Sequence, residues 1–203
     1  MATTTPNNSW PVPTSTDLVK DGATAIEALG DAIDATLGAY TTKGKTLLST
    51  TTLATGTTTV SSINQTYTDL EVVVFGISCS TAMSINFNFN GNNTKFYGSG
   101  YRHGNGFAAA FMGYQNDTRI QMNQGATVAS GNTSNIAVIK ISRYSSTTST
   151  KLATSDFNFY DGSNYVMTSQ MGMFNDTAAI SSFTLTTSTG TFSGGTVLVY
   201  GVR

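Results

Sequence analysis

Apolar residues in most of this chain recur at every second position, which is the spacing of a half-buried β-strand. In the clearest example, residues 83–89 (MSINFNF), large apolar side chains alternate with Ser and Asn. Alternation or a short apolar run predicts strands over residues 70–77, 83–89, 136–141, 152–160, 165–173, 180–185 and 197–202. Clusters of Gly, Asn, Ser, Thr and Asp separate these segments and predict turns. The fold class that follows is mainly β, a jelly-roll-like antiparallel β-sandwich.

The most apolar run and the clearest turn both lie in the first half of this β-region. Residues 70–77 (LEVVVFGI) are expected to form a strand that is buried on both faces. Asn90–Gly91 follows residues 83–89 directly, and this dipeptide favours a β-hairpin because both residues tolerate a positive φ. Residues 108–129 are less regular and are expected to hold a long loop or an edge hairpin.

One segment near the N-terminus has the three- and four-residue spacing of an α-helix instead. Its stripe consists of Ala23, Ile26, Leu29, Ile33 and Leu37. A helix is expected to begin near residues 21–24, with residues 24–27 (TAIE) as a capping box, and to end at the glycine at position 38. A stripe this narrow does not stabilise an isolated helix in water. The helix therefore needs a partner, either the helices of sister chains or its own β-domain.

The first 14 residues hold all three prolines of the chain and are expected to form an extended arm. Trp10, the single tryptophan, lies in this arm and is expected to dock on a sister chain or on a neighbouring protein. The alternative is a contact with the helix that follows it. The domain prediction is an arm and helix over residues 1–38, a Thr-rich connector over 39–66 with one short strand at 45–49, and a β-sandwich over 67–203.

Composition narrows the classes of partner. Charged residues make up 10% of the chain and the formal net charge is −1, so nucleic acid and anionic membranes would bind without their usual electrostatic attraction. No apolar run is long enough for a membrane span, and the N-terminus lacks the features of a secretion signal. We therefore expect neither nucleic-acid binding nor membrane insertion, and assembly in a cytosol. Cys79, the single cysteine, lies in an apolar run and is interpreted as a core residue.

Residues suited to catalysis are sparse, and we expect no enzyme, no cofactor and no metal site. The single histidine, His103, lies among glycines without a Gly-x-Ser-x-Gly motif, and one His with one Cys does not provide a zinc site. Residues 44–46 (GKT) resemble the end of a phosphate-binding loop, but Ala39 stands where that motif requires glycine. Several of the few acidic residues lie in turn clusters, where Asp is favoured for local backbone bonding.

Aromatic and amide side chains are more numerous than residues suited to catalysis, and they favour a binding function. One group is expected in loops and is a candidate for glycan contact, because aromatic rings stack on sugar rings and Arg or His can donate hydrogen bonds: Tyr97, Tyr101, Arg102, His103 and Tyr114. The alternative is that these side chains pack in subunit interfaces. The sequence leaves both interpretations open.

Four segments resemble proteins of bacteriophage particles. They are residues 21–34 (DGATAIEALGDAID), 41–48 (TTKGKTLL), 87–97 (FNFNGNNTKFY) and 194–202 (GGTVLVYGV). Their order is similar to that of phage virion structural proteins in which an N-terminal attachment helix precedes a jelly-roll domain. Residue 45 is Lys where that family usually has Asp, and residue 92 is Asn where the hairpin usually has Asp.

The resemblance implies a structural protein of the virion, assembled in the cytoplasm of the host bacterium. It implies a homotrimeric short tail fibre or adhesin whose β-domain contacts the host surface, with surface polysaccharide as the candidate ligand. The residues expected to attach it to other virion proteins or to sister chains are Trp10, Ile26, Leu29, Ile33 and Leu37. The alternative is a head decoration, cement or head-fibre protein that stabilises the capsid. A carbohydrate-active depolymerase is disfavoured by the shortage of carboxylates.

Overall fold

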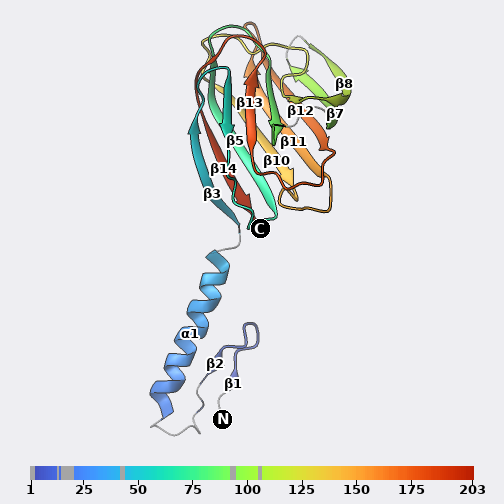
Figure 1. The fold of residues 1–203 in the computed structure, drawn as a ribbon. Coiled ribbons are helices and arrows are strands. Elements are labelled where there is room, and N and C mark those ends of the chain that lie inside the picture. The colour runs from blue at the N-terminus through green and yellow to red at the C-terminus, as the bar shows by residue number, and fades with distance from the viewer. Residues whose placement is uncertain (1–2, 13, 15–20, 42–43, 92–94, 105–106) are drawn as a thin grey trace. The chain divides into compact units, whose positions relative to one another are not determined.

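The computed structural model describes residues 3–12, 14, 21–41, 44–91, 95–104 and 107–203. The chain divides into two compact units, Met1–Gly44 and Lys45–Arg203 (Figure 1). The first unit contains a short hairpin and the one helix found in the described part of the chain, and the second contains the β-sandwich. The predicted 39–66 connector therefore belongs largely to the sandwich, because its Thr-rich residues form two strands, β3 (Lys45–Thr52) and β4 (Thr57–Val60).

The segment predicted as an extended arm contains regular secondary structure. Strands β1 (Thr3–Thr4) and β2 (Pro11–Val12) pair antiparallel, and α1 runs over Gly22–Thr41. The predicted helix and its start near residues 21–24 are confirmed, but the predicted capping box and the predicted end at Gly38 are wrong. Thr24 lies inside the helix rather than at its cap, and the helix continues past Gly38, which does not act as a C-cap. Glycine favours a helix end but does not impose one, because its φ can also take the helical value.

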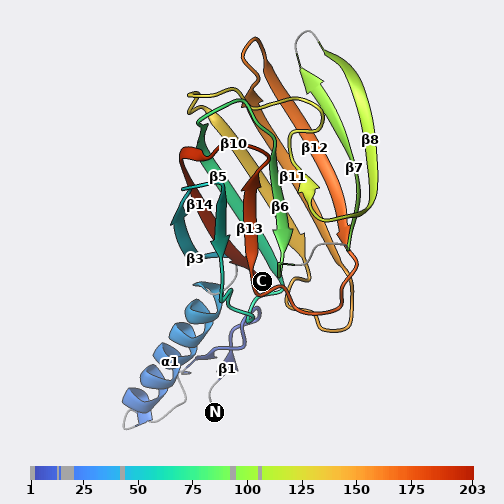
Figure 2. The same ribbon diagram turned by 45° about the horizontal axis from the view of Figure 1, so that its top comes forward.

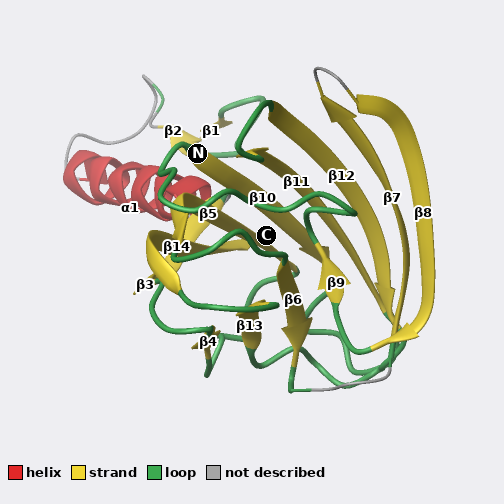
Figure 3. Ribbon diagram, turned by 90° about the horizontal axis from the view of Figure 1, so that it is seen from above, coloured by secondary structure: helices red, strands yellow, loops and turns green. Residues whose placement is uncertain are grey.

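The second unit is an antiparallel sandwich of an eight-stranded and a four-stranded sheet, so the mainly β fold class is confirmed. In the larger sheet the spatial order is β3, β14 (Phe192–Val202), β5 (Asp69–Cys79), β10 (Asn135–Ser142), β11 (Lys151–Tyr160), β12 (Tyr165–Phe174), β7 (Phe96–Gly104) and β8 (Phe107–Asp117). In the smaller sheet it is β4, β13 (Phe183–Thr187), β6 (Ile85–Phe89) and β9 (Ile120–Gln121). The four-stranded sheet covers one face of the eight-stranded sheet, which curves around it (Figures 2 and 3).

The core lies between the two sheets and is rich in phenylalanine. Phe89 contacts the rings of Phe87, Phe96, Phe174 and Phe183 at centroid distances of 5.5–6.2 Å. These residues come from both sheets, so the aromatic cluster joins them. Cys79 is 1% exposed, and burial raises the pKa of its thiol to about 11, which confirms it as a core residue.

Two further predictions about the β-region are wrong. Strand β5 is buried on one face only: Val72 and Val74 point into the core, whereas Phe75 is 42% exposed on the opposite side. Asn90 and Gly91 do have positive φ (53° and 61°), but they do not form a hairpin because β6 and β7 belong to different sheets. The Asn90 side chain instead accepts the backbone N–H of Ser181 (2.8 Å) and donates to the carbonyl of Ala179 (2.9 Å).

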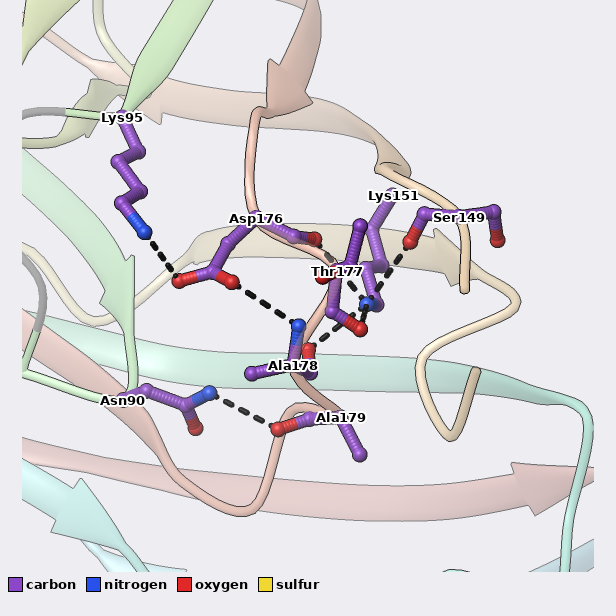
Figure 4. A network of polar contacts seen from close by, with 8 residues as sticks. All are labelled: Asn90, Lys95, Ser149, Lys151, Asp176, Thr177, Ala178 and Ala179. Carbon is purple, nitrogen blue, oxygen red and sulfur yellow. Dashed lines mark hydrogen bonds and ion pairs between the residues drawn. The ribbon is translucent and has the colours of Figure 1, made fainter. Parts of the chain in front are cut away.

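A buried lysine holds the connection from β12 to β13, which crosses from one sheet to the other (Figure 4). Lys151 is fully buried, and its three N–H donors are shared among the carbonyl oxygens of residues 149, 176, 177 and 178, which lie 2.7–3.1 Å from Nζ. Asp176 accepts from Lys95 Nζ (2.7 Å) and from the N–H of Ala178 (2.9 Å). The lysine thus provides donors for carbonyl groups that the irregular connection leaves without a strand partner.

Candidate functional site

The eight-stranded sheet has one face turned away from the smaller sheet, and we call it the outer face. Strand alternation and cross-strand register place on this face all nine large apolar side chains of the sandwich that are exposed among the described residues, at 38–64% exposure. They are Leu47, Phe75, Tyr101, Ile136, Leu152, Tyr165, Met167, Met171 and Met173. Exposed apolar residues that gather on one face indicate an interaction surface for another protein or a ligand.

The register brings these side chains from distant parts of the sequence into rows across the sheet. Phe75 of β5 lies opposite Ile136 of β10, and Leu152 of β11 lies opposite Met173 of β12. Met167, Met171 and Met173 stand along the exposed side of one strand, because the intervening residues 166, 168, 170 and 172 point inward. The outer face is therefore a continuous surface built from at least six strands of the sheet.

A carboxylate lies in the middle of this surface. Asp156 of β11 is exposed and accepts a hydrogen bond from Ser169 Oγ of β12 (2.6 Å). It borders two shallow hollows of about 400 and 180 Å³. The larger also involves Ser99, Tyr101, Thr154 and Met171, and the smaller involves Ile136, Val138, Asn158 and Met167. Hydroxyl, amide and thioether groups therefore surround the Asp156 carboxylate in these open hollows, and such groups can contact a binding partner.

Charged side chains of both signs gather toward one end of the outer face. Lys45 of β3 forms an ion pair with Glu71 of β5, and Glu71 lies opposite Lys140 of β10 in the register. Opposite charges on neighbouring strands stabilise a sheet surface modestly. This end of the face therefore has no strong excess of either sign.

The residues predicted for glycan contact lie in strands rather than loops, so that part of the prediction is wrong. Tyr97 and Tyr101 are on the outer face of β7, where Tyr101 lies opposite Ser169. Arg102 points to the other side of the sheet, and its Nη1 donates to the carbonyl of Gln124 (3.3 Å). His103 lies in β7 and Tyr114 in β8, but their side chains are outside the part of the chain that the structure describes. Among the side chains of this group that the structure describes, Tyr97 and Tyr101 share the outer face.

Sequence reasoning missed the residues that dominate this face. The β12 sequence (YVMTSQMGMF) has large side chains on both sides, so its alternation does not reveal which side faces solvent. Met167, Met171 and Met173 look like core residues by type. The sequence does contain one signal. Thr168, Gln170 and Gly172 are polar or small, so the alternate positions of this strand, which include the methionines, are the more apolar set.

A second candidate surface lies on α1, in the first unit. Ile26 and Leu37 are 65% and 56% exposed, whereas Leu29 and Ile33 are half-buried. We call Ile26, Ile33 and Leu37 the α1 stripe, since they recur at seven and four residues along the helix. Part of the apolar surface of α1 is thus left uncovered within the described chain.

Trp10 contacts the helix of its own chain, which is the alternative interpretation of this residue. Its indole Nε1 donates to Thr36 Oγ1 (2.9 Å), and Thr36 Oγ1 in turn donates to the carbonyl of Ala32 (2.8 Å). The β1–β2 hairpin holds Trp10 in place, because the N–H of Thr5 donates to the Trp10 carbonyl (2.9 Å). Trp10 therefore covers the Thr36 side of α1.

Over the described residues, no group of three or more His, Cys, Asp and Glu side chains could hold a metal ion. The described helix is not long and apolar enough to cross a membrane. No protein-family model, curated protein or solved structure matches the chain. The two uncovered apolar surfaces, the outer face and the α1 stripe, are thus the features on which a function can be argued.

Proposed function

We propose that this chain is a structural protein of a bacteriophage particle. In this proposal it is a homotrimer whose first unit, residues 1–44, attaches it to other virion proteins and to sister copies. The β-sandwich, residues 45–203, is the part that projects and meets the host surface, as in a short tail fibre. The chain acts by binding and has no catalytic role.

The observation that carries the proposal is the α1 stripe. An isolated 20-residue helix with one apolar stripe is marginal in water, and Trp10 with its hairpin covers only part of α1. Ile26 and Leu37 remain exposed to water, which is unfavourable in free energy. Burial of these side chains against another helix or in a groove would remove this penalty. A compact unit with an uncovered apolar helix, joined to a separate sandwich, fits an attachment element followed by a displayed domain.

The resemblance of residues 21–34 and 194–202 to phage virion proteins supports the kind of particle. The same observations fit a head decoration, cement or head-fibre protein, which would also need an attachment element. Location on the particle separates these two possibilities. A depolymerase is not favoured, because the carboxylate in the middle of the outer face, Asp156, bonds to a serine hydroxyl and has no second carboxylate among the residues that line its two hollows.

The experiment is immunogold labelling of purified particles with an antibody against the sandwich. Label at the tail supports the tail-fibre form of the proposal, and label over the head assigns the chain to capsid decoration. Particles without label would overturn the proposal.

The same particles test the α1 stripe. We expect the double variant Ile26→Asp/Leu37→Asp to be lost from particles, because charges at the contact would have to be buried unpaired. The matched control is Ala28→Asp/Ala35→Asp, which adds the same charges at exposed helix positions outside the stripe. Equal incorporation of the two variants would contradict the role given to the stripe.

A further inference from the structure

We propose that the outer face is a second self-association surface, on which the sandwich of one copy packs against the sandwiches of its sister copies. The inference rests on the proposed function in one respect, the homo-oligomer that residues 1–44 are proposed to hold together. It goes further, because it assigns a buried role to a face of the projecting domain.

The amount of apolar surface supports an interface between proteins. Nine side chains of roughly 200 Å² each, about half exposed, present on the order of 900 Å² of apolar area. A standard protein–protein interface buries ~800 Å² of polar and apolar surface per partner. The outer face therefore has the area that a stable contact between two copies needs.

The types of side chain also favour a protein partner over a saccharide. Six of the nine are aliphatic or thioether side chains, and only Phe75, Tyr101 and Tyr165 offer aromatic rings. Methionine is enriched in protein interfaces because its flexible, polarisable side chain adapts to the opposing surface. Sugar rings would leave their hydroxyl groups against side chains such as Ile136 and Met167, which cannot accept or donate strong hydrogen bonds.

A sister copy fits this face better than a strongly charged partner. The charges near one end have both signs, with Lys45 paired to Glu71 and Lys140 opposite Glu71 in the register. A surface of mixed sign can meet its own copy without net repulsion. Copies already joined through residues 1–44 would also hold their sandwiches at high effective concentration, so even a weak contact between outer faces would form.

Methionine oxidation of the full chain provides the test. Exposed methionines are oxidised to sulfoxides by hydrogen peroxide, and mass spectrometry reads each position separately. Met167, Met171 and Met173 lie on the outer face, whereas Met83 and Met122 are 1% and 0% exposed in the core and report whether the fold is intact. The oligomeric state is measured on the same samples by native mass spectrometry.

The decisive variant is Met171→Lys, with Thr57→Lys as its control on an exposed position of the smaller sheet. In the wild-type oligomer and in Thr57→Lys we expect Met167 and Met173 to be protected, so that both oxidise more slowly than in Met171→Lys. In Met171→Lys we expect both to oxidise at least ~3-fold faster, because a buried lysine would separate the faces, while Met83 and Met122 stay protected.

The other outcomes are distinct. An oligomer in which Met167 and Met173 oxidise equally fast in wild type and in Met171→Lys overturns this inference and leaves the proposed function standing. A monomeric full chain overturns the proposed self-association itself, and protection in that monomer would assign the face to the chain's own first unit. Protection that requires added host polysaccharide would assign the face to glycan binding and overturn the inference.

Discussion

At the scale of single residues, one buried charge determines the path of a whole connection. Lys151 begins β11 in the larger sheet, yet three of the four carbonyls that it binds belong to residues 176–178, which lead into the smaller sheet. The connection has no regular secondary structure, so these carbonyls depend on a side chain for their donors. The sequence shows a lysine before a predicted strand and gives no sign that it is buried.

Replacing this lysine should destabilise the fold strongly. We expect Lys151→Met to lower the free energy of unfolding by at least ~3 kcal/mol, because it fills the space but leaves four carbonyl oxygens without their donor. Urea denaturation followed by circular dichroism measures the change. Lys140→Met is the control, since Lys140 is exposed and its replacement should change stability by less than ~0.5 kcal/mol. Equal effects of the two variants would contradict the role of the buried ammonium.

The neighbouring carboxylate should make stability depend on pH in the acid range. The hydrogen bond from Lys95, and then that from the Ala178 N–H, hold the pKa of Asp176 below its ordinary value of 3.8. A carboxyl group whose pKa is lower in the folded state stabilises the fold above the unfolded pKa, and this contribution disappears as pH falls through the folded pKa. Wild type should therefore exceed Asp176→Asn in stability at neutral pH, and the difference should shrink below about pH 4.

Denaturation of both proteins between neutral and acid pH measures this difference. Lys95→Met provides an independent check, because it removes the main cause of the lowered pKa of Asp176 and should weaken the same pH dependence. A stability difference between wild type and Asp176→Asn that stays constant through the acid range would show that Asp176 does not titrate with folding.

At the scale of elements, strands that repeat large apolar side chains could be predicted, whereas β7 could not. The predicted segments overlap β3, β5, β6 and β10 to β14, and most of these strands repeat large apolar side chains on one face. Strand β7 escaped prediction because its inward positions include Gly98 and Gly100. At Gly100 a Cβ would lie 1.7 Å from Oε1 of Gln170, so a larger residue would force this buried side chain, 70 residues away in the sequence, to move.

The same limit explains the missed candidate site. Apolar residues on helices and strands are recognisable by type, but whether another layer covers them depends on tertiary structure. The α1 stripe was predictable because the sequence offers a single helix with a narrow apolar face. The outer face was not, since Met167 and Phe75 have the same type and spacing as core residues and only the arrangement of the two sheets leaves them exposed.

At the scale of the whole molecule, the boundary between the two units falls where β3 begins. The sequence predicted the sandwich from residue 67, whereas the second unit starts at Lys45. The difference arises because β3 is an edge strand of Thr, Ser and Leu with little alternation, and the backbone of β14 rather than a buried face determines its position. Among the described residues, the buried core residues lie between Leu53 and Val199, so no described residue of the first unit belongs to this core.

The second unit should therefore fold without the first. We expect residues 45–203 to keep the thermal midpoint of the sandwich in the full chain within ~2 °C when both carry Met171→Lys, which removes the proposed contact between outer faces and its effect on the midpoint. A shorter chain, 53–203, should melt at least ~5 °C lower and aggregate more readily, because loss of β3 leaves β14 as a bare edge and removes Leu48 from the core margin. Circular dichroism melts compare the three proteins. If residues 45–203 melted as low as 53–203, then residues 1–44 would have to stabilise the sandwich directly, and the separation into an attachment unit and a displayed unit would fail.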